Sequence, residues 1–219
     1  MKLGIEIFIS FLVILLGYGL CCRYFCLEAR QKITFKLSRN RSIYLCCAAV
    51  SFGVLLYFFT RFFYDKTLLE QMKLLVLVGL LFPMAAVDYR YHQIPNQMLL
   101  IGLIIRIILW AAELFIDSTN AIQVGVNGVL GAAIIGGFFL LILLFFKNSI
   151  GMGDIKLFAL MGLYQGLWGL VNSVFYSLCV IFLLSICLLV TKKKKRKDAI
   201  SFGPSILIGT ILAIGLSGM

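Results

Sequence analysis

Charged residues are scarce in this sequence. Only 13% of the 219 residues are Asp, Glu, Lys or Arg, about half the usual share for a soluble domain. Hydrophobic residues make up 62% of the chain, and a soluble protein of this size could not cover so much apolar surface. The composition therefore excludes a soluble globular protein and predicts an all-α integral membrane protein.

Metal-binding residues are scarce as well. The sequence has one histidine, His92, with no cysteine or second histidine close to it, so we expect a solvated residue at the membrane interface. None of the seven cysteines forms a Cys-x-x-Cys pair, which argues against a zinc site. The cysteines are better explained as small buried hydrophobes. We therefore expect neither a metal nor a cofactor.

Long apolar runs, in contrast, are abundant. A transmembrane helix needs roughly 20 mostly apolar residues, and we expect about eight such helices in a single domain, 1–219. The sixth and seventh meet near Asn172 and Ser173 and could form one long kinked helix. The first contains Glu6 and no small-residue cleavage site, so we expect a retained helix rather than a signal peptide. The candidate spans are 3–22, 43–63, 68–87, 97–116, 122–146, 155–172, 173–190 and 199–218.

The basic residues predict the orientation. The net charge of +11 is concentrated in short loops, above all at 23–42 and 192–197. Eight spans place both loops on the cytoplasmic side, as the positive-inside rule requires. The loops 88–96 and 147–154 then also face the cytoplasm, and both termini lie outside. The lysine run could alternatively contact anionic lipid. No basic stripe is interleaved with aromatic residues, so we expect no nucleic-acid partner.

Two of the nine acidic residues suggest a function. Asp88 and Asp154 are 154 − 88 = 66 residues apart and are both predicted at cytoplasmic helix ends. Two carboxylates held close together cannot both ionise, so one keeps a proton near neutral pH. Such a pair supplies a base for water and an acid for a peptide carbonyl, as in an aspartic protease. Either Asp alone could instead be a solvated charge at a helix end.

The residues around each Asp fit such a site. Gly151 and Gly153 remove side chains next to Asp154, which lets another backbone approach closely. Beyond Asp88, Pro95 requires an extended residue before it and suits the first turn of a new helix. Unwound backbone near the membrane is tolerated where it lines a polar cavity.

Three segments resemble motifs of the type IV prepilin peptidases. The first is Asp88-Tyr-Arg-Tyr-His-Gln-Ile94-Pro95-Asn96. The second is Gly151-Met-Gly153-Asp154-Ile-Lys156-Leu157, a Gly-x-Gly-Asp motif. The third is Ser201-Phe202-Gly203-Pro204, which is similar to the family's Pro-Phe-Gly-Pro segment with Ser201 in place of the first Pro. The resemblance covers roughly 80–218 well and the earlier part only as a helix pattern.

The resemblance implies a multi-pass aspartic endopeptidase of the cell membrane. It implies cleavage of type IV prepilin-like precursors at the cytoplasmic face, between a short basic leader ending in Gly and the following apolar helix. Asp88 and Asp154 would be the catalytic pair. The supporting motif residues would be Gly151, Gly153, Lys156, Pro95, Asn96, Gly203 and Pro204.

One departure from the family bears on a second activity. Longer members carry a cytoplasmic domain with paired Cys-x-x-Cys motifs, which is associated with N-methylation of the new pilin terminus. The loop 23–42 is short and has no such tetrad. We therefore expect a peptidase without that domain, and N-methyltransferase activity stays an open question.

The residues alone leave two alternatives. Intramembrane carboxylates are common in proton relays, so a small ion-coupled transporter could use the Asp pair. Against it, both Asp residues fall at helix ends near one face rather than at the midplane. A non-catalytic membrane scaffold is the other alternative, but it has no need of paired Asp motifs. The sequence does not determine the oligomeric state.

Overall fold

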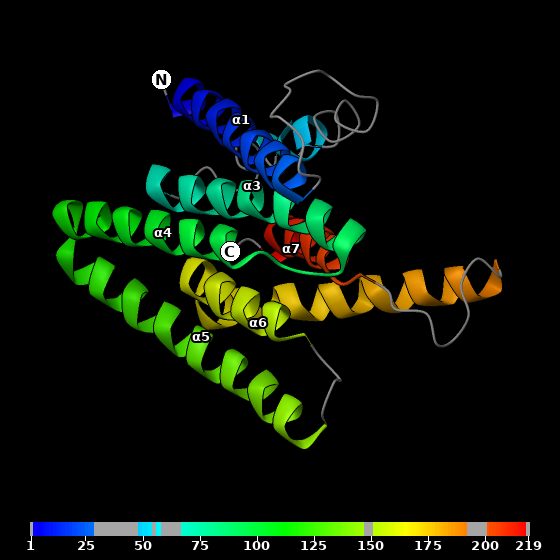
Figure 1. The fold of residues 1–219 in the computed structure, drawn as a ribbon. Coiled ribbons are helices and arrows are strands. Elements are labelled where there is room, and N and C mark those ends of the chain that lie inside the picture. Colours follow the sequence, from blue (N-terminus) through cyan, green and yellow to red (C-terminus); the bar gives the residue numbers. More distant parts are fainter. Residues whose placement is uncertain are drawn as a thin grey trace.

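The computed structural model describes residues 2–28, 48–53, 56–57, 67–146, 151–191 and 201–217. Figure 1 shows the helices packed side by side. Within these ranges no residue is in a β-strand, so the predicted all-α fold is confirmed. The labelled helices are α1 (Lys2–Glu28), α3 (Leu68–Tyr91), α4 (Asn96–Ile116), α5 (Ser118–Phe145), α6 (Met152–Val190) and α7 (Gly203–Ser217).

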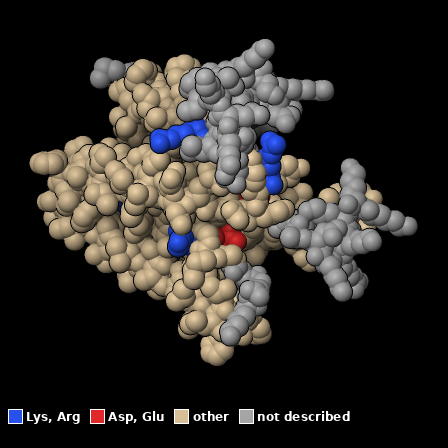
Figure 2. Space-filling view, viewed as in Figure 1, with Lys and Arg blue, Asp and Glu red and all other residues tan. Residues whose placement is uncertain are grey.

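Five of these helices are long and apolar enough to cross a membrane, and α7 is a shorter apolar helix. The face in Figure 2 carries few charged side chains, as expected for a protein surrounded by lipid. A polytopic membrane protein is therefore confirmed. The count of eight spans stays a prediction, since much of the run 43–63 and the lysine run 192–197 lie outside the described residues.

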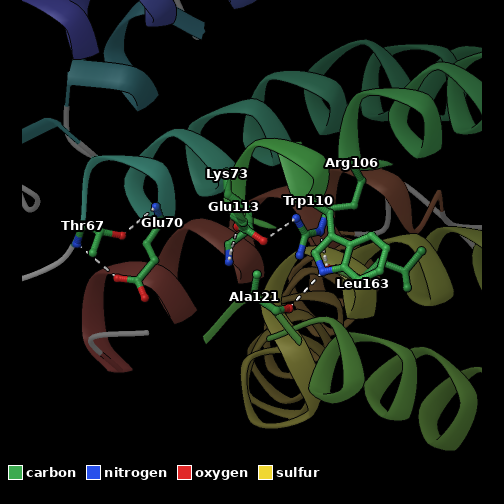
Figure 3. A network of polar contacts seen from close by, with 8 residues as sticks. All are labelled: Thr67, Glu70, Lys73, Arg106, Trp110, Glu113, Ala121 and Leu163. Carbon is green, nitrogen blue, oxygen red and sulfur yellow. Dashed lines mark hydrogen bonds and ion pairs between the residues drawn. The ribbon is translucent and has the colours of Figure 1, made fainter. Parts of the chain in front are cut away.

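Helix α3 is the centre of the bundle. In its most apolar window 83% of the residues are buried, compared with 17% to 33% in the other candidate spans. A capping box begins the helix: the Thr67 hydroxyl accepts from the Glu70 amide, and the Glu70 carboxylate accepts from the Thr67 amide (Figure 3). His92 ends it in the left-handed conformation, with φ 53°, and donates its amide to the Asp88 carbonyl. The exposure predicted for His92 is confirmed.

Helix α6 is broken at Gly166, where φ is 72° and ψ is −175°, a conformation open almost only to glycine. Beyond the break, Ser177 lies against Gly209, in the second turn of α7. Because α7 starts beside Asp88, the second part of α6 must run back toward the end of the bundle where α6 began. Figure 1 shows this reversal between the yellow and orange parts of the helix.

The break corrects one predicted boundary. The junction was expected near Asn172 and Ser173, but both residues are helical and the chain reverses earlier, at Gly166. The Ser173 hydroxyl donates to the Gln165 side chain across the break, at 2.9 Å. The apolar pattern continues through both halves, so it gives no sign of where the direction changes.

Two side chains satisfy the backbone groups that the break sets free. In an unbroken helix the Leu167 amide would donate to the Leu163 carbonyl. Instead, Asn127 Oδ1 of α5 accepts from the Leu167 amide at 3.2 Å. Arg106 Nε of α4 donates to the Leu163 carbonyl at 2.7 Å (Figure 3). Neighbouring helices thus replace both halves of the lost bond, as a lipid environment requires.

Arg106 also belongs to a buried charged cluster that the sequence analysis did not single out. Its Nη1 lies 3.2 Å from Glu113 Oε2, and Lys73 Nζ lies 3.3 Å from Glu113 Oε1 (Figure 3). These side chains are only 6% to 10% exposed. Buried charges are tolerated when they are paired and hydrogen-bonded, and here one acid serves two bases from α3 and α4. Their position inside predicted spans was the available signal.

Small residues bring α5 and the first part of α6 into close contact. A Cβ atom added at Gly162 would lie 2.6 Å from the Ala132 backbone nitrogen, and one at Gly131 would lie 2.9 Å from the Gly166 carbonyl carbon. Backbones that approach so closely gain packing energy in lipid. This contact, together with the capped break, fixes the segment of α6 that carries Asp154.

Candidate active site

Asp88 lies in the last turns of α3 and is 6% exposed. Its Oδ2 atom accepts a hydrogen bond from the Gly203 amide at 2.7 Å and one from the Ser201 hydroxyl at 2.9 Å. A Cβ atom at Gly203 would lie 2.9 Å from both the Cβ and the Oδ2 of Asp88, so a glycine is needed there. The carboxylate of α3 thereby binds one of the free amides at the start of α7.

Asp154 lies in the first turn of α6 and is partly buried. The start of α6 packs against the segment that binds Asp88, because Phe158, one turn beyond Asp154, contacts Phe202. That the two carboxylates act as a pair stays a prediction. The Asp154 amide donates to the Gly151 carbonyl at 3.0 Å. A Cβ atom at Gly151 would lie 3.1 Å from Asp154 Oδ2, so this glycine leaves space for the carboxylate.

The segment after Asp88 packs against the segment that carries Asp154. Pro95 is the N-cap of α4 and Asn96 is its first residue. Asn96 Oδ1 accepts a hydrogen bond from Lys156 Nζ at 3.0 Å. A Cβ atom at Gly153 would lie 3.1 Å from Ile94 Cβ, so the two chain segments approach closely there. The first two motifs are therefore adjacent in space.

Three helices begin where α3 ends. The contacts above place the start of α7 beside Asp88 and the starts of α4 and α6 against each other. Pro204 is the second residue of α7, where a missing amide proton costs little. A helix N-terminus carries partial positive charge, and such charge stabilises an oxyanion that develops on a carbonyl. The arrangement can perform general acid–base chemistry on a carbonyl group.

One contact at this site was not predicted. Ser201 was noted only as a departure from the Pro-Phe-Gly-Pro segment, yet its hydroxyl binds Asp88. The motif indicates the position of Ser201 but not its partner, because Ser201 and Asp88 are far apart along the chain. Residues 147–150 and most of the predicted loop 23–42 lie outside the described residues.

These features define a multi-pass all-α membrane protein with two carboxylates at the meeting point of four helices. The profile of the type IV leader peptidase family matches residues 75–189, which is more than half of the chain and includes both carboxylates. The chain belongs to this family, and the resemblance stated from its motifs is confirmed.

A curated relative is the prepilin leader peptidase/N-methyltransferase of Bacillus subtilis (strain 168). It is 33% identical over 147 residues, and the match covers 66% of this chain. The same match covers 56% of the relative, so the chain spans little more than half of that protein's length. No solved structure matches.

Proposed function

We propose that this chain is a membrane-embedded aspartic endopeptidase. It cleaves the leader peptide from type IV prepilin-like precursors at the cytoplasmic face of the cell membrane. The observation that supports this most strongly is that the helix ends carrying Asp88 and Asp154 have neighbouring segments that pack together, and both residues lie inside the region that matches the family. The name of the Bacillus subtilis relative supports prepilin-like substrates.

In the proposed reaction the two carboxyl groups share one proton. The ionised group takes a proton from water while the water oxygen attacks the scissile carbonyl carbon, and the protonated group donates its proton to the carbonyl oxygen. The resulting diol collapses when one group takes back a hydroxyl proton and the other protonates the peptide nitrogen. The carbon–nitrogen bond breaks, one water is consumed, and the pair again holds one proton.

The substrate partner follows from the position of the site at one end of the bundle. The apolar helix of the precursor would lie in the bilayer against this protein, with its basic leader at the cytoplasmic surface. Cations in the leader are attracted by the two carboxylates and by the anionic leaflet. The proposal does not extend to N-methyltransferase activity, because the loop 23–42 has no cysteine tetrad.

The test is cleavage of a precursor by purified protein in proteoliposomes. The precursor carries a basic leader, Gly and an apolar helix. Asp88→Asn and Asp154→Asn should each lower the cleavage rate by at least about a hundredfold, since Asn keeps the size but cannot exchange the proton. Asp117→Asn is the matched control, because Asp117 is an exposed acid between α4 and α5. Near wild-type cleavage by either site variant would refute the mechanism and favour the transporter alternative.

A further inference from the structure

Ser201 and Gly203 bind the same oxygen of Asp88. The Ser201 hydroxyl donates to Oδ2 at 2.9 Å, and the Gly203 amide donates to Oδ2 at 2.7 Å. A carboxylate with a single hydrogen bond keeps some freedom to turn about its Cβ–Cγ bond. Two donors on one oxygen restrict this rotation and so fix the direction of the other oxygen, Oδ1. Within the described part of the chain, Oδ1 is the oxygen left for water or substrate.

We propose that Ser201 is a positioning residue for the peptidase reaction. Its hydroxyl holds the Asp88 carboxylate in the orientation that presents Oδ1 to the attacking water and to Asp154. This inference rests on the proposed function, since it assigns a role at the same site. It concerns a residue that donates to Asp88 and does not itself react.

The neighbours of Ser201 hold it in place from both helices that carry the carboxylates. The ring of Phe202 packs edge to face against Phe158 of α6, with 5.8 Å between ring centroids. Gly203 lies against the backbone of Ala85 in α3, because an added Cβ would be 3.1 Å from the Ala85 Cα. The segment 201–203 is therefore anchored on α3 and α6 together, so its hydroxyl keeps a fixed direction relative to both carboxylates.

The family segment that this stretch resembles has Pro at the position of Ser201, and proline has no side-chain donor. A purely structural explanation is that Asp88 and Ser201 only fasten the start of α7. The two explanations differ in their effect on kinetics. A positioning role lowers kcat with KM unchanged, because substrate binding does not involve the hydroxyl. A fastening role changes the stability of the fold.

The test compares Ser201→Ala, Ser201→Thr and wild-type protein in the same proteoliposome assay, together with thermal unfolding. We expect Ser201→Ala to lower kcat by about tenfold at unchanged KM. This is less than the roughly hundredfold loss that a 1 Å misplacement can cause, because the Gly203 amide still binds the carboxylate. Ser201→Thr keeps the hydroxyl and should stay within about twofold of wild type. Ser205→Ala is the matched control: Ser205 is fully buried in α7, and its hydroxyl has no hydrogen-bond partner among the described residues.

Wild-type kcat in Ser201→Ala would overturn the inference, and so would an equal loss of kcat in Ser201→Ala and Ser201→Thr. If Ser201→Ala does not fold, Ser201→Cys replaces it, with an intermediate kcat expected from its weaker donor and a wild-type kcat again contradicting the proposal. Asp88→Asn distinguishes a failure of the Ser201 proposal from a failure of the proposed function. Inactive Asp88→Asn with fully active Ser201→Ala refutes only the role of Ser201, whereas active Asp88→Asn refutes the proposed function itself.

Discussion

The break in α6 leads to a prediction about Asn127. Its side chain accepts the Leu167 amide at 3.2 Å, a bond that the broken helix cannot supply. Asn127→Ala removes this acceptor and leaves the amide without its partner. The segment 152–165 has a length of about 21 Å at 1.5 Å per residue, which is less than the roughly 30 Å of the hydrocarbon core. The break therefore lies at membrane depth, where water is not available as a substitute.

Two known magnitudes bound the expected effect of Asn127→Ala. A backbone donor that loses its partner away from water costs about 1 to 3 kcal/mol. Hydrogen bonds between membrane helices contribute on average only about 0.6 kcal/mol, because the separated helices find other partners. The Leu167 amide has few alternatives, since its own helix is interrupted at Gly166. We expect the free energy of unfolding to fall by about 1 to 2 kcal/mol.

The assay is reversible unfolding in mixed micelles. The measured quantity is the fraction of denaturing detergent at the midpoint of unfolding. Asn120→Ala is the matched control, because Asn120 lies in the same helix and its side chain is exposed, with no hydrogen bond among the described residues. A difference between the two variants below about 0.5 kcal/mol would show that Asn127 does not cap the break. The reasoning about lipid-exposed backbone would then be wrong for this site.

Three further predictions follow from other contacts. Gly162→Ala should lower the free energy of unfolding by about 1 to 3 kcal/mol, because the new Cβ would meet the Ala132 backbone; Gly137→Ala, with open space around it, should not destabilise. Hydrogen bonds in the first turn of α5, chiefly from the Thr119 hydroxyl, hold the pKa of Asp117 below its ordinary value of 3.8. Its contribution to stability is thus present above that value and lost as pH falls through the lowered pKa, and unfolding of Asp117→Asn across acid pH should lack this dependence. A cysteine replacing Lys156 should be labelled from the cytoplasm and one replacing Asp117 from outside; the reverse pattern would contradict the predicted topology.

The sequence predicted helix boundaries well where a nearby residue in the chain sets the boundary. The span expected at 97–116 is observed as Asn96–Ile116, because Pro95 marks the start through its own fixed backbone angle. The span expected at 68–87 continues to Tyr91. Its end depends on the left-handed conformation of His92, and no apolar pattern reports that. The length of the apolar run therefore predicted the helix, and the capping conformation of His92 determines its last turn.

The proximity of the segments that carry Asp88 and Asp154 could be predicted for a different reason. Each Asp lies in a motif with its own glycines or proline, and both motifs were expected at the same membrane face. The role of Gly166 could not be found in this way. Its positive φ angle depends on Asn127 and Arg106, which come from other helices and supply the lost hydrogen bonds. A glycine in an apolar helix has the same local sequence signal whether it packs or breaks.

The position of charge along α3 argues against this helix as a proton path in the transporter alternative. Lys73, near the start of the helix, belongs to the charged cluster with Glu113, and Asp88 lies near its end. Every residue from 74 to 87 is apolar, so about 21 Å of the most buried helix separates the two polar regions. A proton relay from the Asp pair across the membrane needs polar side chains along its path, and α3 offers none between Lys73 and Asp88, so a relay would have to run along other helices. Hydrolysis needs polar groups at one face only, which is where α3, α4, α6 and α7 bring them together.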